Sequence, residues 1–229
     1  MADENSPVAP EVEMAFRAAH RALEAVCDDR VLSEERMTIS QVIFQFPVVV
    51  DEANCAAAAQ IGPLIGWRSL PKDDWEPVIA LHDFDNDVHC VDGIELDRRS
   101  VEGLDDWYDS SLYQAARAYR RAAGWDTAPG EGGIWLLMLA PDSHSGGGED
   151  ERVHYSGNLV GFVIVHDRDE DGIYESVAHI WTASSWRRRK VAQRLLAEAQ
   201  KRFSIVEIEG PYTEDGSAFL KACPIDQST

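Results

Sequence analysis

Four consecutive cationic residues, Arg187 to Lys190, carry the clearest chemical signal in the sequence. They follow a strand-like apolar segment and precede residues 191–199, whose apolar side chains recur at helical spacing. A strand that turns into a helix directs the first free backbone N–H groups of the helix, and the positive end of its dipole, at one point. The sequence therefore predicts a phosphate-binding turn here.

The overall charge makes this basic turn stand out. The chain of 229 residues has 41 acidic and 21 basic residues, for a net charge of −20. Such a surface repels nucleic acid and anionic lipid and attracts cationic amines, so nucleic-acid binding is disfavoured. A competing interpretation is a solvated helix start whose arginines pair with acidic neighbours, such as Glu207 or Glu209.

Residues 180–196 resemble the acyl-CoA-binding segment of the GNAT-type N-acyltransferases. The pattern of that family, Gln/Arg-x-x-Gly-x-Gly/Ala, falls on residues 187–192, where Arg187 and Ala192 fit and Trp186 precedes them. Lys190 stands where the family usually has glycine, and its side chain either crowds the phosphate cradle or points outward and adds charge. The order of predicted elements from Ser111 to Cys223 is also similar to that of the family.

The resemblance implies acetyl-CoA, or another acyl-CoA, as the acyl donor. It implies that six residues of the turn and helix start lie at the diphosphate: Arg187, Arg188, Arg189, Lys190, Val191 and Ala192. It also implies that the preceding strand, through Ile180, Trp181 and Thr182, lies beside the pantetheine arm.

Acyl transfer to an amine needs a base that removes a proton from the attacking nitrogen. Glu175 and His179 are our candidates, because they are four residues apart on the predicted strand, on one face with Val177 and Trp181. Tyr212, in the loop after the next strand, is a candidate acid for the leaving thiolate. A solvent-facing carboxylate, a hydrogen-bonded strand histidine and a packing tyrosine are the alternative interpretations.

Apolar periodicity and turn residues predict the elements that position these groups. We expect helices at residues 11–28, 51–59, 112–122, 191–199 and 217–223, strands at 37–50, 134–139, 159–165, 174–182 and 204–209, a hairpin at 77–91 and a flexible loop at 142–152. The fold class is α/β (α+β), with a mixed, mostly antiparallel central sheet flanked by helices.

The chain organisation follows from the same pattern. Residues 1–10 are expected to be a flexible tail and residues 11–229 a single domain, with an elaborated N-terminal half (11–100) and a cofactor-binding core (about 107–223). No apolar run is long enough for a membrane span, and the four dispersed cysteines suggest a reducing compartment, so we expect a cytoplasmic protein.

Two groups of residues contain side chains that often bind metal ions, but we interpret both as polar turns and not as metal sites. Residues 167–172 resemble the start of a calcium loop, but Ala178 stands at the twelfth position, so a polar turn is favoured. His82, Asp83, Asp85, Asp87, His89 and Cys90 match no zinc spacing, which favours a charged hairpin tip.

The sequence thus predicts an acyl-CoA-dependent N-acyltransferase acting on an amine of a small molecule or protein. The alternative is a non-catalytic protein of the same fold whose acidic surface engages a basic partner or mimics nucleic acid.

Overall fold

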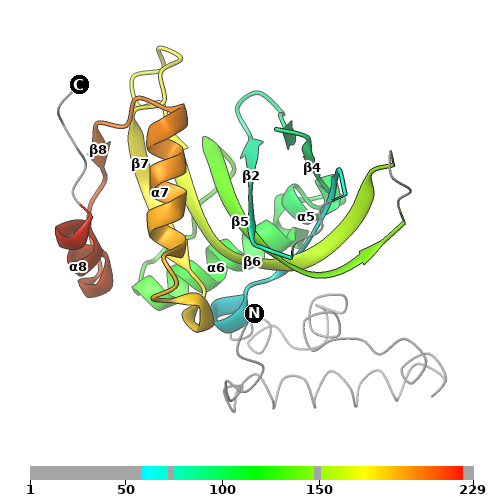
Figure 1. The fold of residues 1–229 in the computed structure, drawn as a ribbon. Helices are drawn as coiled ribbons and strands as arrows, with labels where there is room; N and C mark the ends of the chain where they lie inside the picture. Colours follow the sequence, from blue (N-terminus) through cyan, green and yellow to red (C-terminus); the bar gives the residue numbers. More distant parts are fainter. Residues whose placement is uncertain (1–57, 72–74, 147–150, 224–229) are drawn as a thin grey trace.

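A computed structural model of the protein describes residues 58–71, 75–146 and 151–223, which form one eight-stranded sheet with helices on both faces (Figure 1). In chain order the elements are β1 (Leu64–Ser69), β2 (Val78–Asp83), β3 (Cys90–Val91), β4 (Ile94–Leu96), α5 (Arg98–Val101), η2 (Trp107–Asp109), α6 (Ser111–Ala123), β5 (Ile134–Ser145), β6 (Val153–His166), β7 (Ser176–Thr182), η3 (Ser184–Trp186), α7 (Val191–Arg202), β8 (Glu207–Ile208) and α8 (Glu214–Ala222). Every strand pair is antiparallel except β7 with β8. The predicted fold class, an α+β protein with a mostly antiparallel sheet, is confirmed.

The central strand β5 is apolar over its whole first half because both of its faces are covered. Trp135 and Leu137 pack on the side of α6, whereas Leu136 and Met138 pack on the side of α7. All four side chains are fully buried. A strand between two helical layers has no solvent-facing positions, which explains the continuous apolar run.

The long strand β6 organises the rest of the sheet. One edge of β6 pairs with β5 along most of its length. The other edge pairs with β1 through residues 153–158 and with β7 through residues 161–166. The strands β1 to β4 therefore belong to the same sheet as β5 to β8.

The two long helices lie where they were predicted, although α7 continues to Arg202. Ser110 caps α6 by accepting a hydrogen bond from the Tyr113 N–H at 2.9 Å, and Gly124 ends α6 in the left-handed conformation at φ 71°. Val191 and Leu195 bury the apolar face of α7 against the sheet. In Figure 1, α7 lies in front of the sheet and α6 behind it.

The predicted hairpin at residues 77–91 is only partly correct. A single bridge joins Asp83 to Val88, but β2 pairs with β5, and β3 pairs with β4 instead of β2. The strands β1 and β4 and the short helix α5 were not predicted. Their segments are short and mix polar with apolar residues, so the periodic spacing of apolar side chains was too weak to identify them.

The predicted flexible loop at 142–152 is wrong for its first part. β5 continues to Ser145, with Ser143, His144 and Ser145 paired to residues 154–156 of β6. This extension is polar because it projects beyond the helices that cover the centre of the sheet.

The C-terminal elements are shifted from their predicted bounds. β7 begins at Ser176, β8 is reduced to two residues, and α8 begins at Glu214 because the Thr213 hydroxyl caps it by accepting from the Gly216 N–H at 3.1 Å. The predicted polar turn at 167–172 is confirmed, since the Asp167 carboxylate accepts the Asp171 and Gly172 N–H groups.

The predicted tail, the helix at 11–28, the strand at 37–50 and most of the helix at 51–59 lie outside the described residues, although residues 58–61 are helical. Among the described helices, none combines the length and apolar character required to cross a membrane.

Candidate functional site

The strands β7 and β8 separate after a short parallel ladder and leave a cleft between them. Ser176 pairs with Glu207 and Val177 with Ile208, and the last bond of the ladder runs from the Glu209 N–H to the Val177 carbonyl at 2.8 Å. From Ala178 onward, the edge of β7 turned away from β6 lines a cleft of about 880 Å³. α6, the start of α7, the loop after β8 and α8 form the remaining walls.

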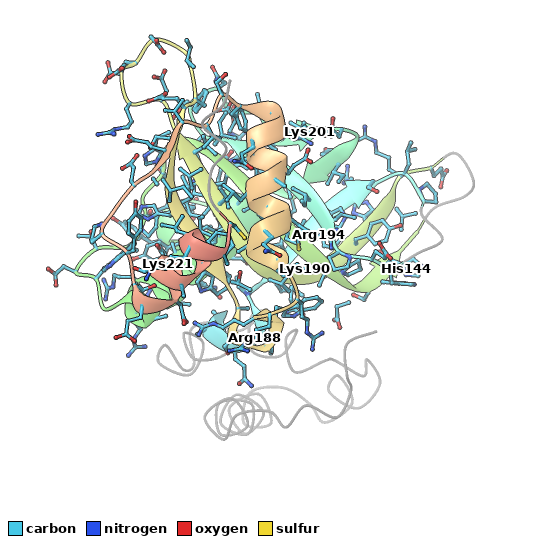
Figure 2. The ribbon with its side chains drawn as sticks, turned by 60° about the vertical axis from the view of Figure 1, so that its left-hand side comes forward. His144, Arg188, Lys190, Arg194, Lys201 and Lys221 are labelled. Carbon is cyan, nitrogen blue, oxygen red and sulfur yellow. The ribbon has the colours of Figure 1, made fainter. Side chains whose placement is uncertain are left out.

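The basic turn forms one end of this cleft. Lys190 is the N-cap residue of α7 and makes no side-chain capping bond there. The first N–H groups of a helix have no acceptor within the helix, so those of α7 stay available to a ligand. Figure 2 shows Arg188 and Lys190 at this end of α7 and Lys201 at the opposite end.

The backbone of the turn explains why a glycine is usual at this position in the resembled family. Lys190 has φ 62° and ψ 19°, a left-handed conformation, and Arg188 also has φ 62°. Glycine adopts this region without a steric penalty, whereas other residues are strained there. The Lys190 side chain is exposed at the rim of the cleft, so it points outward and adds charge instead of filling the cradle.

The competing interpretation is correct in part, because Arg187 pairs with an acidic neighbour, although that neighbour is Asp215 of α8 rather than Glu207 or Glu209. Arg187 Nη1 lies 3.0 Å from the Asp215 Oδ2 of α8, and the Arg189 guanidinium stacks 5.1 Å from the centre of the Trp186 ring. Glu207 forms its ion pair with Arg168. Because the Arg187 and Asp215 side chains are 52% and 80% exposed, their pair adds little stability.

Most of the predicted site residues meet in this cleft. Its lining includes nine of them: Ile180, Trp181, Thr182, Arg187, Arg188, Lys190, Val191, Ala192 and Tyr212. Three others, Glu175, His179 and Arg189, are not part of the lining.

Glu175 and His179 do not share a face, contrary to the expectation from an uninterrupted strand. A bulge at Ala178 shifts the register, since Ile164 pairs with His179 and the next residue of β6 pairs with Val177. Val177 consequently packs on the side of α7, whereas Trp181 packs on the side of α6.

Glu175 lies before β7 and belongs to the neighbouring turn. Its Oε1 accepts a hydrogen bond from the Arg168 N–H at 3.2 Å. Its Oε2 is buried and has no hydrogen-bond partner among the described residues. This carboxylate therefore contributes to the turn between β6 and β7.

His179 packs among aromatic rings behind the cleft. Its ring lies 5.3 Å from Trp125 and 5.6 Å from Tyr119, whose hydroxyl is 3.5 Å from Nδ1. Burial, assisted by nearby His166, lowers the pKa of His179 from 6.5 to about 4, although the charge of Glu209 opposes this shift. The imidazole is consequently neutral near pH 7 and a weak base.

Tyr212 lines the cleft but its hydroxyl already has a partner. The hydroxyl donates to the Ile208 carbonyl at 2.6 Å, and the side chain is 48% exposed. The phenol would have to leave this carbonyl before it could donate to a ligand.

Glu209 is the carboxylate that sequence reasoning missed as a catalytic candidate. It lines the cleft, is half-buried, and its Oε1 accepts a hydrogen bond from the Ser176 hydroxyl at 2.5 Å. Its position at the point where β7 and β8 separate depends on the pairing of two strands distant in sequence. Only its place at the end of a predicted strand, before Gly210 and Pro211, could have suggested it.

A comparison of sequences supports an acetyltransferase as the class of protein. Residues 173–222 match the model of a family described as the ESCO1/2 acetyl-transferase. The matched segment covers β7, the basic turn, α7, β8 and α8 up to its last residue. No curated protein and no solved structure matches the chain at a significant level. The match supports acetyl transfer in general as the chemistry of the cleft.

Proposed function

We propose that the protein is an N-acetyltransferase that transfers the acetyl group of acetyl-CoA to an amine. The observation that carries this proposal is the cleft itself. One wall is the free edge of β7, which leads directly into the basic turn and the uncapped start of α7. These features suit an extended ligand with an amide-containing arm and a diphosphate.

The proposed donor fits both parts of the cleft. Free N–H groups at the start of α7, with Arg187, Arg188 and Lys190 around them, would hold the diphosphate. The edge of β7 from Ile180 to Thr182 would pair with the amides of the pantetheine arm, as a strand pairs with a neighbour. The local field is positive there although the chain has a net charge of −20.

Bound acetyl-CoA would supply an activated acetyl thioester. The protein must then take a proton from the attacking amine and return one to the departing sulfur. We assign the first task to Glu209, because its carboxylate lies within the cleft and is oriented by Ser176. Tyr212 stays our candidate for the second task, after its hydroxyl leaves the Ile208 carbonyl.

The chemistry of the acceptor follows from the charge of the same cleft. Glu209, Glu214 and Asp215 also line the cleft. Asp215 pairs with Arg187, but Glu209 and Glu214 would still attract a cationic amine. A protonated amine bound beside Glu209 can transfer its proton to the carboxylate before the nitrogen attacks the acetyl carbonyl.

Calorimetric titration with acetyl-CoA tests the donor site. We compare the protein with the double variant Arg187→Ala/Arg188→Ala, which removes two cationic side chains that line the cleft, and with Lys201→Ala as a control cation at the far end of α7. We expect the double variant to weaken binding at least about 10-fold, since a hydrogen bond to a charged group contributes about 1.5–3 kcal/mol. Lys201→Ala should bind as the unmodified protein does.

Failure of acetyl-CoA to bind at millimolar concentration would reject it as the donor. If longer acyl-CoAs also failed, the alternative of a non-catalytic acidic binding protein would be favoured. If acetyl-CoA binds, a screen of cationic amines for thiol release identifies the acceptor, and Glu175→Gln and His179→Phe test the two candidate bases outside the cleft beside Glu209→Gln.

A further inference from the structure

A second cluster of titratable side chains lies away from the cleft, where the turn after β2 meets α5. Asp87, His89 and Glu102 each offer one potential ligand atom, and these atoms all lie within 4.8 Å of one another. The sequence shows only Asp87 and His89 close together. Glu102 is brought to them because it ends α5, which packs beside this turn.

His82 provides independent evidence that the cluster is built for a ligand. It is fully buried in β2, and neither of its ring nitrogens has a hydrogen-bond partner among the described residues. Its Nε2 is 3.8 Å from Glu102 Oε1, too far for a hydrogen bond. A buried polar atom without a partner is costly, and a bound ion would remove that cost.

The 3.8 Å between His82 Nε2 and Glu102 Oε1 suits two ligands of one metal ion better than a hydrogen bond between them. Ligands of a tetrahedral zinc ion at about 2.0–2.1 Å lie roughly 3.3 Å apart. Glu102 uses Oε2 to bind Arg98 and leaves Oε1 facing His82. The buried Nδ1 of His89 also has no partner within the described part of the chain.

The neighbouring groups define the charge of the cluster. Arg98 bridges Glu102 and, at 3.2 Å, Asp87, so the two carboxylates have one cationic partner between them. Two carboxylates around this single guanidinium leave one negative charge of the cluster uncompensated. That balance favours a further cation.

Two other residues of the same stretch are already engaged elsewhere. The Asp83 carboxylate accepts hydrogen bonds from the Asp85 and Asn86 N–H groups. Cys90 is exposed and its sulfur faces Arg152. The cluster therefore offers nitrogen and oxygen ligands, with no thiolate.

We propose that Asp87, His89 and Glu102 form a binding site for a divalent transition metal ion of the zinc type, with the buried His82 beside Glu102. An imidazole nitrogen and two carboxylate oxygens, with a fourth position left for His82 or a water molecule, suit Zn²⁺ better than Mg²⁺ or Ca²⁺, which prefer oxygen alone. The ion links the turn after β2 to the end of α5 and stabilises the N-terminal strands. Arg98 competes with it for the carboxylates.

Zinc titration of the full-length protein, first freed of metal with a chelator, tests the site. We expect one high-affinity Zn²⁺ per chain, and a rise in Tm of about 5–10 °C at a free zinc concentration about 100 times Kd. Co²⁺ in its place should give the visible absorption of a tetrahedral ion. No binding, or no change in Tm, would overturn the proposal.

Ligand variants locate the ion. Glu102→Gln and His89→Gln, both at partly exposed positions, should weaken zinc binding by more than about 100-fold, because changes in residues around the ligands already cost about 10–100-fold. Glu95→Gln and His154→Gln, which alter similar residues elsewhere on the same sheet, should leave affinity unchanged. Equal affinity in all four variants would place the ion elsewhere and contradict the proposal.

Arg98→Gln distinguishes a metal site from a simple ion-pair cluster. If a metal ion and Arg98 compete for Glu102 and Asp87, this variant binds zinc more tightly than the unmodified protein. If the cluster only anchors Arg98, the variant loses stability and zinc does not restore it. The second result would overturn the proposal without depending on the fold of a ligand variant.

Discussion

Two regions of the molecule assemble their side chains in different ways. One is the cleft between β7 and α8, and the other is the N-terminal strands β1 to β4 together with the helix α5. In the cleft, the basic turn and the helix it opens are consecutive in the chain. In the N-terminal strands, His82, His89 and Glu102 meet only because a turn packs against the end of a short helix. A site made by consecutive elements leaves a pattern in the sequence, whereas a site made by packing does not.

We expect the largest effect from a substitution in the cleft that changes the catalytic group and keeps its hydrogen bond. Glu209→Gln removes the proposed base while keeping a group that can accept from the Ser176 hydroxyl. We expect kcat for amine acetylation to fall about 10²–10⁴-fold, with acetyl-CoA affinity unchanged.

Glu207→Gln is the matched control, because this exposed carboxylate lies two residues before Glu209, in β8, but pairs with Arg168. Equal loss of activity in both variants, or none in Glu209→Gln, would show that the cleft does not use Glu209 as a base.

Substitution of a glycine in β6 tests how tightly the side of the sheet next to the cleft is packed. A Cβ at Gly161 would lie 2.5 Å from Val191 Cγ1 and 2.8 Å from the Trp181 carbonyl oxygen, so Gly161→Ala would push the start of α7 away from the sheet. We expect a loss of about 1–3 kcal/mol in the free energy of unfolding, measured with urea, and weaker acetyl-CoA binding.

Gly66→Ala is the counterpart in the N-terminal strands. There the nearest atom, Cβ of Asp97, is 3.2 Å away and belongs to a side chain. The cost should be smaller, and acetyl-CoA affinity should not change. A larger cost at Gly66 would contradict the view that the cleft side is the more tightly constrained.

Acidification tests the buried histidine behind the cleft. Burial lowers the pKa of His179 to about 4, so between pH 6.5 and pH 4 the unfolded chain binds a proton that the folded chain does not. Stability from this residue is therefore present above pH 6.5 and is lost as the pH falls.

His179→Phe should make the decline in unfolding free energy between about pH 6.5 and pH 5 shallower, by less than about 1.4 kcal/mol per pH unit. Exposed His144, at the far end of β5, supplies the control variant His144→Gln, which should retain the full decline. An unchanged slope in His179→Phe would mean that the histidine is not held neutral.

The smallest expected effect concerns the strained turn. Lys190→Gly removes both the side-chain charge and the left-handed strain, whereas Lys190→Ala removes only the charge. We expect Lys190→Gly to be more stable than Lys190→Ala by about 1 kcal/mol in thermal or urea unfolding, while both bind acetyl-CoA equally less well. Equal stability of the two variants would argue against strain at this residue.

The sequence by itself determined the elements whose signals are local. The period of residues 191–199 predicted α7, the period of residues 112–122 predicted α6, and the run of four cations lies at the start of α7, at one end of the cleft. Each of these signals depends on residues within one or two helical turns, so no partner segment is needed to interpret them.

Tertiary structure decided the rest, because strand pairing joins residues that are far apart in the chain. The choice of β5 as partner of β2 replaced the expected hairpin, and the bulge at Ala178 put His179 and Val177 on opposite faces. The pairing of β7 with β8 brought Glu209 into the cleft. A shift of one residue in register reverses which face a strand side chain occupies, and a sequence pattern alone does not fix that register.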